Sequence, residues 1–243
     1  MMMMHQHSPS ILDFRKKFSH VPVPLGYTDL EVVYDISSGR RYITPEGKSY
    51  PSITTVLGSR GKEGLLAWRK RVGEAEADRI SRIAAGNGSL VHGLCERYIN
   101  NSEEVLSGKE MPVVKQSFLT IKKVLDRALG EVYLQECALY SDHLAVAGRV
   151  DLVAKFEGKL SIIDFKTSSR VKSRTDIHNY FIQEAAYAIM VEERTGLPVN
   201  NLVTIMAVNN SNEPLIFIEK RDNWVTELRG AIHDYQRDKI FNN

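Results

Sequence analysis

The stretch VAGRVDLVAKFEGKLSIIDFKT, residues 146–167, decides how this chain folds. Residues that favour strands lie on both sides of Glu157-Gly158, a dipeptide that suits a tight turn, so the stretch predicts a β-hairpin. With the turn centred between Glu157 and Gly158, Asp151 lies opposite Asp164. Because side chains alternate between the two faces of a strand, Lys166 shares a face with Asp164. Two carboxylates and one ammonium group are therefore predicted to meet in an otherwise apolar hairpin.

Packing alone does not explain this charged patch. Directly opposed residues of antiparallel strands have Cβ atoms about 4.5–5.5 Å apart, where like charges destabilise the sheet. A divalent cation such as Mg²⁺, which takes carboxylate oxygens as ligands, resolves the repulsion. Replacing Asp164 is then expected to relieve its repulsion with Asp151 and to raise stability without metal. The alternative is a salt bridge in which Lys166 serves both acids, and a register shift of one residue would remove the facing pair.

Helices and strands alternate on both sides of the hairpin. The expected elements are a helix over 113–129, a strand over 131–140, the hairpin strands over 146–156 and 159–167, a helix over 175–194, strands over 202–208 and 215–218, and a final helix over 222–239. This order predicts an α/β fold with a central mixed sheet flanked by helices. We expect one domain over 26–243, divided into an N-terminal elaboration (26–110) and a core (111–243), after an irregular segment over 1–25.

The N-terminal elaboration is predicted to be mostly helical. Its expected elements are strands over 30–36 and 41–44 joined by Ser37-Ser38-Gly39, a short helix over 51–58 that ends at Gly58, and helices over 64–85 and 90–99. Ser49 is the expected cap of the short helix. Gly86-Asn87-Gly88 is expected to interrupt the helical region, and Ser89 to cap the helix that follows.

Composition excludes several classes of protein. With 243 residues, 43% hydrophobic and 26% charged, the chain matches a folded globular protein and not a disordered one. Its longest apolar stretches, such as 160–165 and 202–208, are too short to cross a bilayer. Met1–Ser10 lacks the apolar region of a signal peptide. The two cysteines cannot form a disulfide framework, which favours a reducing, cytoplasmic compartment.

Basic residues are concentrated in two stretches, although the net charge is only +2. Between Arg149 and Arg174, seven basic residues stand against three acidic ones, and between Arg60 and Arg71 five stand against one. Solvated surface is the usual explanation for such a stretch. The charge distribution therefore permits a nucleic-acid partner and does not by itself identify one.

Several motifs, in the right order, resemble those of the PD-(D/E)XK nuclease superfamily. The core signature is resembled by Gly148-Arg149-Val150-Asp151, followed after twelve residues by Asp164-Phe165-Lys166. Two motifs of the RecB-like branch are also resembled: QxxxY by Gln183-Glu184-Ala185-Ala186-Tyr187, and G-(S/T)-x-x-H by Gly88-Ser89-Leu90-Val91-His92. YPSITTVL (50–57) and WRKRVG (68–73) resemble phage exonucleases related to the mitochondrial genome maintenance exonuclease. The resemblance covers roughly residues 40–210.

This resemblance implies a restriction-endonuclease-like core that hydrolyses phosphodiester bonds with one or two Mg²⁺ or Mn²⁺ ions. The implied metal ligands are His92, Asp151, Asp164 and the Phe165 carbonyl. Lys166 would orient the attacking water or offset charge on the phosphorane. Gln183 and Tyr187, four residues apart on one helix face, would offer an amide and a phenol to a phosphate or a flanking nucleotide.

Each of these residues also has a structural explanation. A single histidine such as His92 is commonly a core residue, and Gln183 with Tyr187 also fits an amphipathic helix with a buried tyrosine. Glu96, one helical turn after His92, supports the site or is structural. Glu136, on the strand that precedes the hairpin, is a further ligand candidate that the pattern supports poorly.

The most favoured activity is exonucleolytic digestion of linear single-stranded DNA. The N-terminal elaboration is expected to arch over the sheet and form a passage that a strand must thread. Candidate DNA contacts are Trp68, Arg69, Lys70, Arg71, Arg149, Arg170, Lys172 and Arg174, with Tyr50, Trp68 or Tyr187 stacking on bases. The alternatives are a structure-selective endonuclease and an inactive DNA-binding module. The presence of Asp151, Asp164 and Lys166 together opposes the inactive module.

The sequence lacks the residues that an iron–sulfur cluster and an ATP-driven motor would need. An iron–sulfur cluster normally needs four cysteines and the chain has two, so no cluster is expected. No Walker A motif is present, so any helicase motor must be another chain.

Expected partners are DNA and other replication or recombination proteins, with no membrane contact; the oligomeric state is not predicted. The phage resemblance implies a phage-infected bacterial cell and a role in DNA recombination or repair.

Overall fold

A five-stranded mixed sheet forms the centre of the computed structural model, which describes residues 16–35, 39–58, 60 and 62–241. The strand order is β4 (Leu129–Ser141), β5 (Val146–Phe156), β6 (Lys159–Ser168), β7 (Asn201–Val208) and β8 (Leu215–Lys220). Only β6 and β7 pair in parallel, because α5 (His178–Thr195) connects them; the other neighbours are antiparallel. The predicted α/β class, with helices flanking a mixed sheet, is confirmed.

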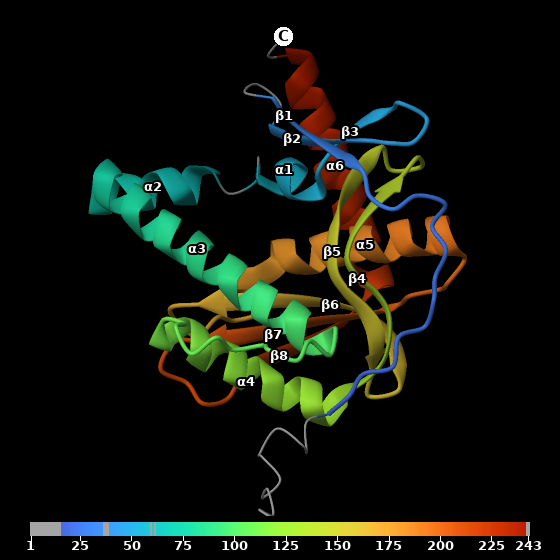
Figure 1. The fold of residues 1–243 in the computed structure, drawn as a ribbon. Coiled ribbons are helices and arrows are strands. Elements are labelled where there is room, and N and C mark those ends of the chain that lie inside the picture. Colours follow the sequence, from blue (N-terminus) through green and yellow to red (C-terminus); the bar gives the residue numbers. More distant parts are fainter. Residues whose placement is uncertain (1–15, 36–38, 59, 61, 242–243) are drawn as a thin grey trace, which may run out of the picture.

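Helices cover both faces of this sheet (Figure 1). On one face, α3 (Glu74–Ile99) and α4 (Pro112–Ala128) pack in a core that includes Leu152, Ile163 and Val203. On the other, α1 (Ile53–Gly58), α5 and α6 (Val225–Phe241) pack in a core with Val153, Ile162 and Leu202. Neighbouring residues of one strand thus enter opposite cores, as the alternation of side chains requires.

The central hairpin has the predicted register but a shorter ladder. Glu157 and Gly158 both have positive φ values, 47° and 80°, as a two-residue turn of type I′ requires. The β5–β6 pairs run from Phe156 with Lys159 to Leu152 with Ile163 and stop there. The predicted facing pair of Asp151 and Asp164 is therefore not formed, since the strands separate one pair earlier. Asp164 instead pairs in register with Thr204 of β7.

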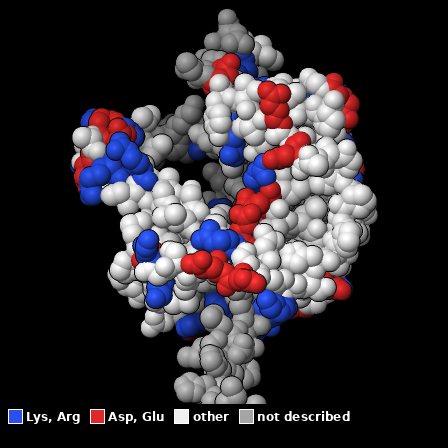
Figure 2. Space-filling view, viewed as in Figure 1, with Lys and Arg blue, Asp and Glu red and all other residues white. Residues whose placement is uncertain are grey.

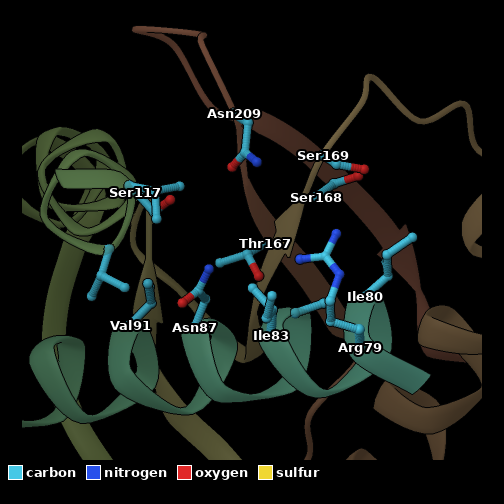
Figure 3. Close-up of a pocket in the computed structure, with 13 residues that line it drawn as sticks. Arg79, Ile80, Ile83, Asn87, Val91, Ser117, Thr167, Ser168, Ser169 and Asn209 are labelled. Carbon is cyan, nitrogen blue, oxygen red and sulfur yellow. The ribbon is translucent and has the colours of Figure 1, made fainter. Parts of the chain in front are cut away.

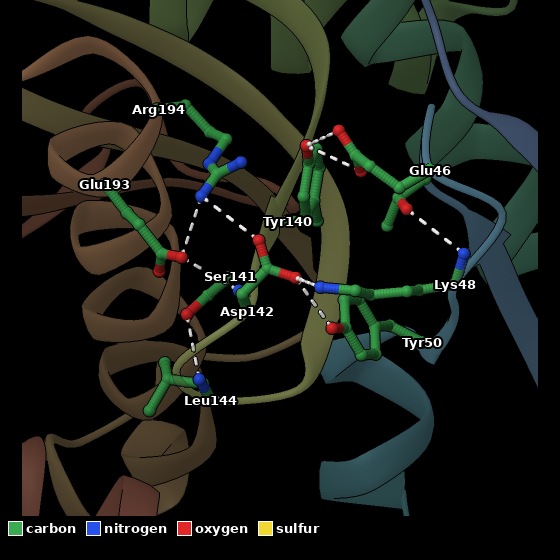
Figure 4. A network of polar contacts seen from close by, with 10 residues as sticks. Glu46, Lys48, Tyr50, Tyr140, Ser141, Asp142, Leu144, Glu193 and Arg194 are labelled. Carbon is green, nitrogen blue, oxygen red and sulfur yellow. Dashed lines mark hydrogen bonds and ion pairs between the residues drawn. The ribbon is translucent and has the colours of Figure 1, made fainter.

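A small antiparallel sheet precedes the helices. It consists of β1 (Glu31–Asp35), β2 (Gly39–Ile43) and β3 (Ser49–Pro51). The predicted hairpin is present, although its connecting residues 36–38 lie outside the described part of the chain, and β3 was not predicted. Polar contacts fasten β3 to the large sheet: the Asp142 carboxylate accepts hydrogen bonds from Lys48 (2.6 Å) and Tyr50 (2.8 Å) and faces Arg194 of α5 at 3.4 Å (Figure 4).

Two predicted helix boundaries are wrong. Ser52, and not Ser49, caps α1, because its Oγ accepts the N–H of Thr55 at 3.0 Å while Ser49 lies in β3. The helical region breaks at Gly73, where φ is 89°, between α2 (Lys62–Val72) and α3. Gly86-Asn87-Gly88 lies inside the continuous α3, so Ser89 caps no helix. The buried second half of α3 outweighs the weak helix propensity of these glycines.

The remaining predicted elements are present with small shifts. Two single-turn 3-10 helices, η2 (Thr175–Ile177) and η3 (Arg221–Asn223), lead into α5 and α6. Residues 16–25, the described part of the segment expected to be irregular, contain a single bridge in which His20 pairs with Val132. Among the helices that the structure describes, none combines the length and the apolar character that a membrane span needs.

Candidate active site

A cleft of about 530 Å³ opens where β5 and β6 separate. Figure 2 shows the molecule hollowed between the arm that α2 and α3 form and the rest of the chain, with acidic and basic side chains along the rim. The cleft itself is lined by Arg40, Thr54, Gly88, Ser89, His92, Gly93, Glu96, Glu136, Arg149, Asp151, Gln183 and Tyr187. These residues come from the small sheet, α1, α3, β4, β5 and α5, so no single segment builds the site.

Three groups in the cleft form a metal-ligating cluster. One ligand atom each from His92, Glu136 and Asp151 lie within 4.8 Å of one another, and His92 Nδ1 lies 3.4 Å from Asp151 Oδ2. Burial, reinforced by the charges of Asp151 and Glu96, raises the pKa of Glu136 to about 7. An imidazole nitrogen and two carboxylate oxygens suit a divalent cation, which would compensate this crowded negative charge.

The backbone at Glu136 is unusual for a strand. Its φ is 44°, in the left-handed region that residues other than glycine rarely adopt. The β4–β5 register is the same on both sides of it, from Gln135 with Leu152 to Cys137 with Val150. Its carbonyl accepts a short hydrogen bond from the Arg149 guanidinium. Strained backbone of this kind is concentrated at functional sites, which agrees with a role for Glu136 there.

Asp164 and Lys166 form a second, more buried unit beside this cluster. Their side chains make an ion pair, and only 1% of the Asp164 side chain is exposed. Burial raises the pKa of Asp164 above its ordinary value, and Lys166 opposes that rise. The Lys166 ammonium also lies 4.9 Å from the ring centre of Tyr180. Among the described residues Lys166 makes no ion pair with Asp151, so the shared salt bridge is not formed.

Phe165 joins the two units through its backbone. Its N–H donates to Asp151 Oδ2 at 2.8 Å. The N–H and C=O of one strand residue point to the same edge of the strand, so its carbonyl is also directed toward β5. The β5–β6 ladder has ended at this level, and the carbonyl faces the space between the strands.

Helix α5 places Gln183 at the site and Tyr187 behind it. Gln183 Nε2 donates to Asp164 Oδ1 at 3.2 Å and to the Tyr187 hydroxyl at 3.4 Å. Tyr187 is only 2% exposed, so its ring cannot stack on a base. A Cβ on Gly148 would lie 2.7 Å from Tyr187 Cε1, which explains why these motif positions combine a glycine with a tyrosine.

Sequence reasoning did not identify two further residues. Arg40 of β2 lines the cleft, where its guanidinium donates to Thr54 Oγ1 at 3.0 Å, and it has no acidic partner in the described part of the chain. Glu184 is fully buried beneath the site and accepts a hydrogen bond from Thr204, which ties α5 to β7. No local pattern distinguishes Arg40 from Arg41. The only sequence feature that pointed to Glu184 as a site residue was its position directly after Gln183.

Four of the seven basic residues predicted to contact DNA are already engaged within the protein. Four arginines pair with acids: Arg69 with Glu74 and Asp78, Arg149 with Asp29, Arg170 with Asp176, and Arg174 with Glu219. Arg69 thus fastens α2 to α3, and Tyr50 is bonded to Asp142. Lys70, Arg71 and Lys172 have no acidic partner among the residues described, and Trp68 is half-buried on α2. The DNA contacts stay predictions.

Comparisons with known proteins agree with this geometry. The family described as the PD-(D/E)XK nuclease superfamily matches residues 64–214, a range that holds His92, Glu136, Asp151, Asp164 and Lys166. The mouse (Mus musculus) protein named mitochondrial genome maintenance exonuclease 1 is 29% identical over 146 residues. This match spans 57% of the present chain and 43% of the mouse protein, less than half of that relative's length.

Proposed function

The chain belongs to the PD-(D/E)XK nuclease superfamily, and from this premise we propose that it is a metal-dependent exonuclease for linear single-stranded DNA. The observation that supports the proposal best is the metal-ligating cluster of His92, Glu136 and Asp151 beside the ion pair of Asp164 with Lys166. The name of the mouse relative, an exonuclease, agrees with digestion from an end.

The donor set fits Mg²⁺ or Mn²⁺. His92, Glu136 and Asp151 would hold the ion, with Asp164 and the Phe165 carbonyl available on the adjacent strand. Glu136 therefore joins the ligands that the sequence favoured. A bound ion would lower the pKa of a water molecule and stabilise charge on the scissile phosphate.

Three side chains of the site would stabilise charge, position a carboxylate and bind a phosphate oxygen. Lys166, held between Asp164 and the Tyr180 ring, offsets negative charge that develops on the phosphorane. Gln183 holds the Asp164 carboxylate in place. Arg40 binds a phosphate oxygen at the opposite wall of the cleft.

The hollow beneath the arm supports the end requirement (Figure 2). A strand that passes between α3 and the small sheet must be threaded from a terminus. A duplex about 20 Å wide is too broad for such a passage, a width in keeping with the groove dimensions of B-form DNA.

The proposal includes a division of the chain into an N-terminal elaboration over 26–110 and a core over 111–243. It also includes a cytoplasmic role in DNA recombination or repair.

End-labelled linear single strands, blunt duplexes and closed single-stranded circles, each with Mg²⁺, Mn²⁺, Ca²⁺ or EDTA, test the proposal. We expect only linear single strands to be degraded, and only with Mg²⁺ or Mn²⁺, because Ca²⁺ takes more ligands in a looser geometry. Lys166→Ala serves as the matched inactive control. Linearisation of the circles at the same enzyme concentration would favour the endonuclease. Binding without cleavage under all conditions would favour the inactive DNA-binding module.

A further inference from the structure

A second pocket lies across α3 from the catalytic cleft. Its volume is about 310 Å³, and α3, the start of α4 and the carboxyl ends of β6 and β7 enclose it (Figure 3). Thr167, which follows Lys166 directly, is in its wall and lies against Gly88 of the catalytic cleft, where an added Cβ would be 3.7 Å from Thr167 Oγ1. The two cavities therefore adjoin at the crossing of α3 and β6.

The polar lining of this pocket suits an anion. Asn87, Thr167, Ser169 and Asn209 face it, and their side chains make no hydrogen bond to any other described residue. Arg79 is the charged residue of the lining, and no carboxylate belongs to it. Its guanidinium is engaged with Glu76 only in an exposed pair on α3, of a kind that contributes little and exchanges readily. The catalytic cleft, in contrast, has Glu96, Glu136 and Asp151 in its walls.

The opposite wall is apolar and accessible. Ile80 and Ile83 of α3, residues that are 38% and 49% exposed, line the pocket together with Val113 of α4. Figure 3 shows Ile80 and Ile83 on α3, with Asn87 beside them, and Ser168, Ser169 and Asn209 on the strand side. Apolar side chains on α3 that face the Ser169 hydroxyl and the Asn209 amide match a nucleotide, which has a flat base and a charged phosphate.

We propose that this pocket binds a nucleotide of the substrate strand that flanks the scissile phosphate. The phosphate lies against Asn87, Thr167, Ser169 and Asn209, and the base covers Ile80 and Ile83. This inference rests on the proposed function, because only a strand held at Lys166 would continue past Thr167 into the pocket.

A negative charge placed in the pocket tests the proposal. Ser169→Asp and Asn209→Asp should each weaken binding of a labelled single-stranded oligonucleotide in Ca²⁺ by about tenfold, which corresponds to about 1.4 kcal/mol. Ser169→Asn should weaken it less than Ser169→Asp. Asn223→Asp makes the same change in η3, at the opposite end of β7 from this pocket, and should have an effect of less than about twofold because salt screens exposed charges over about 8 Å.

Oligonucleotides with one neutral methylphosphonate linkage, moved along the strand, locate the contact. At one position, the neutral linkage should weaken binding to the unaltered protein, which loses a phosphate contact. The same linkage should not weaken binding to Ser169→Asp, because the phosphate charge that the new carboxylate repels is then absent. Equal binding by the Ser169→Asp and Ser169→Asn variants, or the absence of any such linkage position, would overturn the pocket assignment. Failure of the unaltered protein to bind or cut single strands would instead overturn the proposed function.

Discussion

Asp164 and Lys166 are an ion pair largely withdrawn from water, so removing either charge leaves the other without compensation. Such a loss costs roughly 3 kcal/mol or more. Asp151 does repel Asp164, since its charge raises the pKa of that carboxyl, but the opposing effect of Lys166 is larger. Replacing Asp164 is therefore expected to lower stability and not to raise it.

We expect Asp164→Asn and Lys166→Met each to lower the free energy of unfolding by roughly 3 kcal/mol and to abolish cleavage. The double variant should lose clearly less stability than the two single variants lose together, because it leaves neither charge buried without a partner. Urea denaturation of the four proteins measures this coupling. Additive losses would show that the pair is not coupled.

The neighbouring arginines Arg40 and Arg41 differ in what they face. Arg40 lines the catalytic cleft, whereas Arg41 points away from it and is bonded to the Ser49 hydroxyl at 2.8 Å. Arg40→Ala should raise the Kd for single-stranded DNA by about tenfold, the loss of one hydrogen-bonded phosphate contact. Arg41→Ala is the matched control, and fluorescence anisotropy is the measurement. An equal loss in both variants would mean that only bulk charge matters.

At the scale of elements, the arm depends on where its helical region breaks. Gly73 has a φ of 89°, which a residue with a Cβ adopts only with strain, whereas Gly86 lies within α3 with nothing within 4 Å of an added Cβ. Gly73→Ala should destabilise the protein by about 1–3 kcal/mol. Gly86→Ala should stabilise it by about 0.5–1 kcal/mol. Thermal unfolding compares the two, and destabilisation by Gly86→Ala would argue against a continuous α3.

At the scale of the whole molecule, the small sheet is joined to the core by a buried cluster that includes Tyr42, Tyr140 and Ala147, and by exposed polar contacts around Asp142. The side chain of Asp142 is 36% exposed, so its contacts with Lys48 and Arg194 contribute at most about 1 kcal/mol each. Asp142→Ala should speed amide hydrogen exchange in β1 and β2 while leaving β6 protected, because losing these contacts favours local opening of the small sheet and leaves the central strands untouched. Glu213→Ala, which removes a comparable exposed pair with Lys123, should change neither. Equal loss of protection in β6 would mean that the two sheets unfold together.

Local physics explains what could be predicted from the sequence. The turn at Glu157-Gly158, the strands on either side and the placing of Asp164 with Lys166 on one face follow from strand alternation and turn chemistry within about twenty residues. The resemblance added His92 and Gln183, because motif spacing carries information about contacts between distant segments. The hairpin agrees with the structure, which also places His92 and Gln183 in the cleft; their roles there stay predictions.

Only the tertiary structure decided the rest. Asp164 pairs with Thr204 of β7 because a parallel strand returns through α5. Glu136 joins the site through an unusual φ in β4, and Arg40 reaches the cleft from the small sheet. Packing of its second half keeps α3 helical through Gly86-Asn87-Gly88. Each of these features depends on burial or pairing between elements far apart in the chain, and the periodicity of a single segment does not predict such contacts.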